Sequence, residues 1–585
     1  MEKKIRKILK DKDVSFQIQD NIVFLDGKVK DYDEWVQMGL QIGEISDVDG
    51  VVNQVTWREK HNKKLQKRME KRSRVYEQNK DKKPKETDVV VIGGGIIGCF
   101  IARELSKYKC RVILLEKEPD VSLGASRANN GMVHPGISPS YKTLKRKLNI
   151  QGNQDYDQIC EELNVSFRRS GSLILITPKT LEEYRRYLPG FLYKFFLKHI
   201  LPFFVKLKGK RNGVKNIEIV KNQKIWEMEP WATRDALSAV YIPSTGILDP
   251  YDLTIALAEN AEENNAKIEC NQEVVGFKKQ DDNIISVVTG KGVYNCKMVI
   301  NAAGVFADEI AELAGTCEYT IHPRKGVELL FDRRIQPSLY HCLAELKLPS
   351  HPTSKGGGVN PTVHKNIIWG PTAVEIPDKN DTTVGREEIC EMQKKYKSVL
   401  KEDFPSQKII RYFAGVRAPT FTEDFIIRPA KWTSNFIHVA GIQSPGVASA
   451  PAIAKYVLEI IQTQGLNLKK KEDFSPLRKP IVSAKKMNSK KLEEKIQDNP
   501  KWGNIICTCE MVSEAEIIEA IRRGAESIDA IKRRTRACMG NCQGSYCELR
   551  IAKILARELD QPLNQVVKEN KKSRLFNGYV RGEKP

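Results

Sequence analysis

The alternation of apolar and polar residues predicts a large α/β domain preceded by a small module. Over residues 87–465, short apolar runs typical of buried strands alternate with stretches of helical periodicity, as an α/β architecture requires. Residues 1–57 predict two strands, Asn21–Leu25 and Gly50–Val55, on either side of a helix near Asp33–Ile45. We therefore expect an α/β protein whose N-terminal residues form a separate, small α/β unit.

Charged stretches with few apolar residues mark the boundaries between the parts of the chain. Residues 58–86 are rich in lysine and arginine, which predicts either a solvated linker or a polar helix between two folding units. A second charged stretch, residues 466–503, precedes a cysteine-rich module at residues 504–560. The last residues, 561–585, predict a polar tail.

Composition narrows the class of protein. The chain of 585 residues is longer than one hydrophobic core usually serves, and 41% hydrophobic with 29% charged residues is ordinary for a globular protein. No run of eighteen uncharged apolar residues predicts a membrane span, and the charged N-terminus does not resemble a secretory signal, so we expect a cytoplasmic protein. The net charge of +22 indicates either an anionic partner, such as a membrane surface, or merely solvated lysine faces. We expect no nucleic acid partner, because the basic segments lack interleaved aromatic residues and recognition motifs.

A glycine-rich turn between an apolar run and a helical pattern predicts a dinucleotide site. The run Asp88-Val-Val-Val-Ile92 enters Gly93-Gly-Gly95-Ile-Ile-Gly98. In this context Gly93 permits a tight turn, Gly95 lets the backbone approach a pyrophosphate and Gly98 allows close helix packing, while the helix N-terminus carries partial positive charge. Glu116 ends the next strand, 23 residues beyond Gly93, where its carboxylate can accept hydrogen bonds from ribose hydroxyls.

Two further segments favour FAD over NAD. Residues Gly124–Gly136 are mostly glycine and other small residues, which suits a segment that runs beside an isoalloxazine ring. Residues Val299–Gly304 form another apolar run that ends in small residues, which permits close approach of the backbone to a cofactor. The cofactor contacts predicted in these two segments are Ser126, Asn130, Gly131, Ala303 and Gly304.

Together with four later segments, these residues resemble the D-amino-acid-oxidase-like superfamily of FAD-dependent oxidoreductases. The later segments are Pro243–Pro250, Gly370–Ala373, Ala414–Arg417 and Val439–Gly446. The resemblance implies a Rossmann-like FAD-binding domain with an inserted α+β substrate domain. It also places Gly441, Pro445 and Gly446 at the cofactor.

Two groups within that superfamily are similar to this chain. The segment His134-Pro-Gly136 and the run Ala414–Arg417 resemble L-2-hydroxyglutarate oxidase. The coupling to a C-terminal cysteine module resembles the large subunit of anaerobic glycerol-3-phosphate dehydrogenase. The segment Gly358-Val-Asn360-Pro-Thr362 carries asparagine where we align a histidine of the hydroxyglutarate oxidases, which argues against that substrate.

Five of the thirteen cysteines lie in the C-terminal module. Thirty-two residues separate the pair Cys507 and Cys509 from the pair Cys542 and Cys547, and such pairs can bring four thiolates to one metal centre, an iron–sulfur cluster or a structural zinc. The sequence around them resembles the bacterioferritin-associated-ferredoxin-like domain, which implies a helical module holding a [2Fe–2S] cluster on these four cysteines. Cys538 stands where relatives usually have glycine, so the resemblance leaves it out as a fifth, non-ligating thiol.

The N-terminal module resembles the BON domain over the runs Val23–Val29 and Val48–Val55. Some members of that family use the domain at phospholipid surfaces, so the resemblance implies a membrane contact.

The run Tyr187–Leu207 is crowded with phenylalanine and leucine but punctuated by lysines. Pro189 and Pro202 limit a helix there to about three turns, too short to span a bilayer. We interpret the run as an interfacial helix whose apolar face enters the lipid headgroup boundary, with a core helix as the alternative.

These features predict a dehydrogenase of a small anionic hydroxy compound, either sn-glycerol 3-phosphate or a 2-hydroxy acid. A flavin accepts two electrons as hydride and a [2Fe–2S] centre carries one, which implies onward transfer to an acceptor protein or a quinone. His134 is the candidate base for the hydroxyl proton, or it merely hydrogen-bonds beside the flavin. Arg417 and, more weakly, Lys325 are candidates for holding the anionic group, against a structural ion pair and a solvated lysine. The second hypothesis for function is a flavin redox sensor that binds an anion or a membrane.

Overall fold

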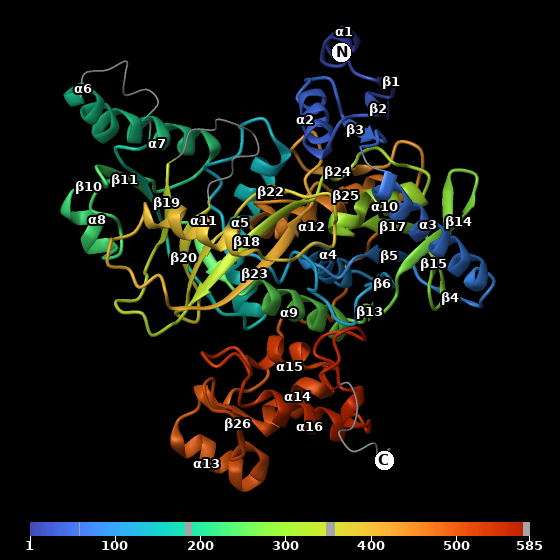
Figure 1. The fold of residues 1–585 in the computed structure, drawn as a ribbon. Helices are drawn as coiled ribbons and strands as arrows, with labels where there is room; N and C mark the ends of the chain where they lie inside the picture. The colour runs from blue at the N-terminus through green and yellow to red at the C-terminus, as the bar shows by residue number, and fades with distance from the viewer. Residues whose placement is uncertain (58, 181, 183–189, 347–356, 577–585) are drawn as a thin grey trace. The chain divides into compact units, whose positions relative to one another are not determined.

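The computed structural model describes residues 1–57, 59–180, 182, 190–346 and 357–576 of the chain (Figure 1). The chain divides into two compact units. The first comprises residues 1–117, 122–161 and 165–475, and the second comprises residues 118–121, 162–164 and 476–585. The N-terminal residues, which we expected to fold separately, therefore belong to the same unit as the dinucleotide turn.

A six-stranded sheet forms the centre of the first unit. All neighbouring strands in it are parallel except the last pair. In spatial order the strands are β13 (Lys267–Glu269), β6 (Val112–Leu115), β5 (Val89–Ile92), β17 (Met298–Asn301), β25 (Phe436–Ala440) and β24 (Ile426–Pro429). Every residue of β5, β6 and β17 is buried, which explains their almost continuous apolar sequences. Helix α4 (Ile96–Ser106) lies on the sheet, and α9 (Pro250–Glu263) and α12 (Gly446–Thr463) pack against α4.

A second sheet packs against alternate residues of the first. Its strands in spatial order are β14 (Val274–Gln280), β15 (Asn283–Thr289), β16 (Val293–Asn295) and β4 (Pro84–Glu86). Val90 and Ile92 of β5 share one apolar core with Phe277 and Val287 of this sheet, and with Ile310 of α10 (Ala307–Leu313). The dinucleotide turn is thereby fixed between two layers.

Residues 58–86, for which we considered a linker or a polar helix, contribute strand β4 and helix α3 (Glu59–Asn79), which lies beside β14 and β15 (Figure 1). Val75 and Tyr76 of α3 join the apolar core of that sheet, and the Arg72 guanidinium pairs with Glu309 at 2.8 Å. The polar helix is therefore correct and the solvated linker is wrong, because one narrow edge of an otherwise charged helix is buried.

The N-terminal module packs onto the rest of the first unit through an aromatic contact. Its elements are α1 (Glu2–Ile8), β1 (Val14–Gln19), β2 (Ile22–Gly27), α2 (Tyr32–Gly43) and β3 (Gly50–Asn53), with the strands in the order β1-β2-β3. Strand β1 is an element that the sequence pattern did not predict. Phe421, which follows strand β23 (Ile409–Arg417), enters the core of the module beside Trp35, and a Cβ placed on Gly39 of α2 would lie 2.4 Å from the Phe421 ring. This close approach explains why the module is not a separate body.

The inserted domain is built on a nine-stranded sheet. Eight strands in spatial order are β10 (Glu218–Lys221), β11 (Ser238–Ile242), β9 (Ser172–Ile176), β19 (Cys342–Glu345), β20 (Gly358–Pro361), β21 (Ile367–Gly370), β18 (Arg324–Phe331) and β22 (Val374–Glu375); β23 (Ile409–Arg417) also pairs with β18. Val327, Leu329 and Phe331 alternate along β18 and belong to a large apolar core, which α8 (Gln223–Met228) and α11 (Arg386–Lys397) close. The intervening residues of β18 therefore face the other side of the sheet.

A small antiparallel sheet and two helical segments complete the first unit. The sheet consists of β7 (Met132–Val133), β12 (Gly246–Leu248) and β8 (Phe167–Arg168), and η3 (Gly304–Phe306) follows β17. The helical segments are α5 (Leu144–Glu162), which extends into the second unit at its last residue, and the run α6 (Gly190–Phe195), η2 (Phe196–Ile200) and α7 (Leu201–Asn212).

The second unit, drawn orange to red in Figure 1, is mainly helical. Its elements are η4 (Ala484–Lys486), α13 (Ser489–Asp498), η5 (Pro500–Trp502), β26 (Ile505–Cys507), β27 (Val512–Ser513), α14 (Glu514–Arg522), α15 (Ile528–Thr535), α16 (Glu548–Glu558) and η6 (Leu563–Gln565). Part of the expected linker, 484–502, is therefore helical. Val566 is fully buried in the core of this unit, so the chain beyond residue 560 is not simply a polar tail.

Candidate active site

The turn between β5 and α4 has the shape that dinucleotide binding needs. Gly93 has φ of +110°, and a Cβ placed on it would lie 2.5 Å from the carbonyl oxygen of Ala302, at the end of β17. A Cβ on Gly95 would meet only the Ser126 Oγ, at 3.2 Å, which leaves room beside the first turn of α4. The turn, the end of β17 and the segment containing Ser126 are thus brought together as predicted.

Two side chains hold the N-terminal end of α4. The Ile96 N–H donates to the Ser126 Oγ at 2.9 Å, and the Gly94 N–H donates to the Glu116 Oε2 at 2.6 Å. Glu116 thus lies at the end of β6 beside the turn, where a ribose would approach. Gly304 begins η3 with φ of +58° and has open space around its Cα, while Ala303 precedes it. This donor set and these open positions fit an FAD molecule.

Asn130 and Gly131 fix the local backbone of residues Gly124–Gly136, which we call the flavin segment. The Asn130 Oδ1 accepts a hydrogen bond from the Met132 N–H at 3.2 Å, and a Cβ on Gly131 would lie 2.0 Å from the Leu248 carbonyl oxygen of β12. Their conformations place His134 at the end of β7. Neither observation places the two residues against a cofactor, so their predicted contact stays a prediction.

His134 meets the loop that follows β25. Its Nε2 lies 3.2 Å from the Ser444 Oγ, and its carbonyl oxygen accepts hydrogen bonds from the side-chain amides of Asn149 (2.8 Å) and Asn153 (3.0 Å) on α5. The imidazole is partly exposed. In the same loop Gly441 has φ of +70°, and Pro445 and Gly446 lead into α12. The structure therefore joins two segments that lie 310 residues apart and that sequence reasoning assigned to one site.

The polar face of the nine-stranded sheet lies against the flavin segment. The register pairs Gly326 of β18 with Gly415 of β23, and Arg324 with Arg417. A Cβ on Gly415 would lie 2.2 Å from the carbonyl oxygen of Ala128, and a Cβ on Gly326 would lie 2.5 Å from the Arg417 Nη2. Small residues on two strands thus allow Arg417 and the flavin segment to approach each other. We call this side of the sheet the substrate face.

Arg417 is a half-buried cation with little compensation. Its Nη1 donates to the Thr372 carbonyl oxygen at 3.0 Å, and burial lowers its pKa. Within the described part of the chain, its guanidinium forms no ion pair with a carboxylate. Arg324, opposite it, is neutralised by Glu375 and by Glu423, the latter at 2.7 Å. Of the two arginines Arg324 and Arg417, Arg417 is therefore the one without an ion pair to a carboxylate in the described structure, and its guanidinium could bind an anion.

Glu328 and Asn360 are two buried polar residues of the substrate face that sequence reasoning did not assign to the site. Glu328 is fully buried, and burial raises its pKa to about 8 although Arg417 acts in the opposite direction. In the described residues, the Glu328 Oε2 and both polar atoms of the Asn360 side chain find no hydrogen-bond partner. Unpaired buried polar groups are costly, so their grouping with Arg417 indicates a polar ligand. An acidic residue between Val327 and Leu329 in an apolar strand was the available signal.

Lys325 lies apart from the substrate face. Its ammonium donates to the Thr383 carbonyl oxygen at 3.0 Å and pairs with Glu388 of α11 at 3.3 Å. The side chain is buried, so it is not the solvated lysine that we considered either. The structure does not bring it together with Arg417, because neighbouring residues of a strand point to opposite faces.

The five C-terminal cysteines lie close together in the second unit. The Cys509 and Cys542 sulfurs are 3.6 Å apart, the Cys538 and Cys547 sulfurs are 3.4 Å apart, and the Cys507 thiol also contacts Cys547. Among the described residues, no group of three or more His, Cys, Asp or Glu side chains is arranged around a single metal ion. Instead, one sulfur pair and one sulfur trio stand side by side, which suits two irons with two thiolates each.

The basic side chains near the cysteines are engaged by carboxylates. Arg533 and Arg534 pair with the buried Asp120 at 2.9 and 2.8 Å, and Arg536 lies 3.6 Å from Glu510. These ion pairs hold the loops of the module.

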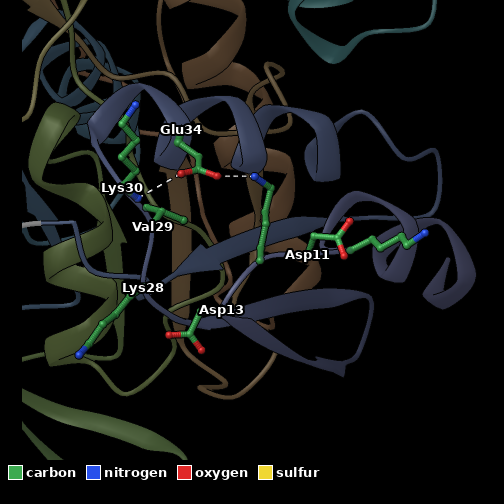
Figure 2. Close-up of a pocket in the computed structure, with 8 residues that line it drawn as sticks. Asp11, Asp13, Lys28, Val29, Lys30 and Glu34 are labelled. Carbon is green, nitrogen blue, oxygen red and sulfur yellow. Dashed lines mark hydrogen bonds and ion pairs between the residues drawn. The ribbon is translucent and has the colours of Figure 1, made fainter.

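A hollow of about 370 Å³ lies on the N-terminal module (Figure 2). Glu34, Lys30 and Lys12 line the hollow. The Glu34 carboxylate accepts a hydrogen bond from the Lys30 backbone N–H, as Figure 2 shows, and another from the Lys12 ammonium. None of the predicted site residues lines it, so we assign no part of the chemistry to it.

Comparison with known families agrees with both cofactor assignments. The FAD dependent oxidoreductase family matches residues 88–460, and the BFD-like [2Fe-2S] binding domain matches residues 505–557. The pyridine nucleotide-disulphide oxidoreductase family matches residues 4–133, which include the same dinucleotide turn.

Individual relatives cover most of the chain. The glycerol 3-phosphate dehydrogenase of Caloramator mitchellensis is 38% identical over 505 residues, 85% of this chain and 99% of the relative. The glycerol 3-phosphate oxidase of Mycoplasma genitalium is 31% identical over 401 residues, 66% of this chain and 97% of the relative. The solved structure of dithionite-reduced L-alpha-glycerophosphate oxidase from Mycoplasma pneumoniae, with FAD bound, is similar with a TM-score of 0.59 and 26% identity, covering 68% of this chain and 100% of that chain. The chain therefore belongs to the FAD-dependent oxidoreductase family, and it binds FAD as well as a [2Fe–2S] cluster in its BFD-like C-terminal domain.

Proposed function

We propose that this protein is a dehydrogenase of sn-glycerol 3-phosphate. The observation that carries the substrate class is Arg417, a half-buried guanidinium without an ion-pair partner in the described structure, on a face that lies against the flavin segment. A phosphate dianion would satisfy its fork of donors. Two of the relatives above are named for their action on glycerol 3-phosphate, which supports the same substrate.

Residues of the substrate face and of the loops after β7 and β25 have distinct parts in this proposal. Arg417 holds the phosphate. His134 takes the proton of the secondary hydroxyl, and Ser444 orients the imidazole through its Nε2. Asn360 and the protonated Glu328 offer hydrogen bonds to the remaining oxygens of the substrate.

The two cofactors define the electron path. When bound, FAD supplies a two-electron hydride acceptor and the [2Fe–2S] cluster a one-electron carrier. We propose that the acceptor is a protein or a quinone. The protein would then work in the cytoplasm at the inner membrane face, with the N-terminal module as a BON-like contact; its order of elements, α1-β1-β2-α2-β3, supports a compact α/β module.

Anaerobic flavin bleaching tests the substrate. We expect sn-glycerol 3-phosphate to bleach the flavin absorbance of the purified protein within seconds, and L-2-hydroxyglutarate, glycerol and amino acids to leave it unchanged. Glycerol is the matched control, because it offers the same hydroxyl without the phosphate that Arg417 binds. Bleaching by L-2-hydroxyglutarate in place of glycerol 3-phosphate would refute the proposal.

Iron analysis tests the choice of cluster ligands, Cys507, Cys509, Cys542 and Cys547. We expect about two irons and two acid-labile sulfides per chain, and we expect Cys542→Ser to lose both while keeping FAD. Among the described cysteines, Cys542 is the thiol that lies beside Cys509, so its loss leaves that iron one ligand short. Cys538→Ser is the control and should retain the cluster, because Cys507 and Cys547 remain. Loss of iron from Cys538→Ser with retention in Cys542→Ser would show that the assignment is wrong.

A further inference from the structure

The segment α6–η2–α7 is one continuous helical run with an apolar inner face. Tyr193, Leu197 and Leu201 are buried against Ile176 of β9. Residues 187–189 of the run Tyr187–Leu207, which include Pro189, lie outside the described residues. Pro202 does not end the helix, contrary to our expectation, because it lies in the first turn of α7, directly after the π-helical turn η2, where proline is tolerated. The core-helix alternative is therefore confirmed for this face, and the interfacial alternative stays a prediction.

The outer face of the same helix is also apolar. Phe191 is 74% exposed, Phe203 57% and Phe204 56%. The further exposed large apolar side chains of this face are Leu192, Phe195, Ile200 and Leu207. Globular proteins rarely expose such a contiguous group without a partner.

The π turn brings the two halves of this outer face into line. In a regular α-helix, Phe203 would lie about 120° around the axis from Phe191, because twelve residues separate the two and each adds about 100°. The Leu201 N–H instead bonds to the Phe196 carbonyl oxygen, five residues back, which adds one residue to the turn. The Leu197 carbonyl oxygen accepts a hydrogen bond from the Ser238 Oγ of β11 at 3.1 Å, which anchors the turn to the sheet. The phenylalanines of both halves therefore share one side.

The charge around this face is of one sign. Residues 190–212 contain six lysine and arginine residues and no aspartate or glutamate. Lys194 and Lys198, one turn apart, lie along one edge of the helix, and the exposed Tyr141 ring lies under the Arg211 guanidinium at 5.0 Å. Aromatic rings surrounded by flexible cations are typical of helices that lie in a membrane interface.

We propose that the outer face of α6–η2–α7 docks onto the surface of a bilayer that contains anionic phospholipids. The phenylalanines enter the boundary between headgroups and acyl chains, while the lysines meet phosphate and carboxylate groups. The absence of acidic residues from 190–212 and the net charge of +22 favour an anionic surface over a protein partner with mixed charges. Within the described residues, no helix is long and apolar enough to cross a bilayer, so the contact lies on the surface. The proposal is independent of the substrate assignment.

Co-sedimentation of the FAD-loaded full chain with vesicles tests the proposal. We expect binding to phosphatidylglycerol vesicles at low salt, weaker binding at high salt, and little binding to phosphatidylcholine vesicles. Phe203→Ser with Phe204→Ser should lower the partition coefficient for anionic vesicles by about tenfold or more, since each inserted ring contributes apolar burial. FAD absorbance and thermal unfolding of the same sample report whether the variant is folded.

Two control variants, one for the rings and one for the lysines, make the result interpretable. Tyr412→Ser removes a ring that is similarly exposed on β23, and it should bind vesicles as the parent does. Lys194→Gln with Lys198→Gln should weaken binding to anionic vesicles, whereas Lys490→Gln with Lys491→Gln on α13 should not. No binding by the folded parent, or equal binding by all variants, would overturn the proposal. A parent that dimerises through this face without binding vesicles would overturn it too.

Discussion

A His134→Asn variant is expected to oxidise its substrate about 100- to 10 000-fold more slowly than the parent, which is the range that a positioned general base contributes. The His134 Nε2 lies 3.2 Å from the Ser444 Oγ, so the ring is oriented at the point where β7 and the loop after β25 meet. Because the proton leaves the hydroxyl during hydride transfer, the loss should appear in the rate of anaerobic flavin bleaching. Stopped-flow mixing with saturating substrate measures that rate directly.

The FAD content of His134→Asn and its affinity for substrate should stay close to those of the parent. Ser444→Ala is the matched variant: it removes the partner of the Nε2 but leaves the imidazole, so its rate should lie between the other two. If His134→Asn bleaches as fast as the parent, the histidine merely borders the flavin and another group takes the proton.

Arg417→Ala is expected to lower kcat/KM by about 30- to 1000-fold, equivalent to roughly 2–4 kcal/mol of transition-state binding for one charge-assisted bidentate contact. The expectation rests on a guanidinium that is half-buried on the substrate face and donates to the backbone carbonyl oxygen of Thr372 at 3.0 Å. Steady-state kinetics with a soluble electron acceptor measures the effect. Most of it should appear as a raised KM, since the phosphate is held in both the ground state and the transition state.

Lys325→Gln is the control for the arginine. The two residues face opposite sides of neighbouring strands, and the Lys325 ammonium pairs with Glu388 at 3.3 Å. We expect Lys325→Gln to change thermal stability more than kcat/KM. Arg417→Lys should recover part of the lost activity, because it restores the charge without the fork. A loss of FAD from Arg417→Ala equal to its loss of activity would identify Arg417 as a folding or cofactor residue.

Features of the site that depend on short stretches of sequence were predictable. The dinucleotide turn needs a strand, three glycines and a helix in direct succession, and the carboxylate of Glu116 ends the next strand. The cysteine pairs likewise lie within a few residues of each other, and the structure brings them together. In both motifs the residues that act together are near neighbours in the chain, so their type and spacing alone indicate the chemistry.

The substrate face depended on register between distant strands and was predicted only in part. Glu328 and Asn360 are brought to one face by the pairing of β18, β21 and β20, and no local pattern specifies that pairing. Arg417 was predicted through resemblance, and Lys325 was chosen because the alternation along Arg324–Phe331 was not assigned to faces. Helix α3 shows the same limit: two buried residues, Val75 and Tyr76, are too few to stand out in a composition dominated by lysine.

The π turn at Phe196–Ile200 makes the outer face of α6–η2–α7 sensitive to chain length as well as to composition. Deletion of one residue within the turn would restore the regular winding and rotate Phe203 and Phe204 away from Phe191. The number of phenylalanines and lysines would hardly change, yet the continuous apolar strip would become two short patches on different sides. Homologous chains that differ from this one by a single residue in this turn would thus share its composition but lack its surface.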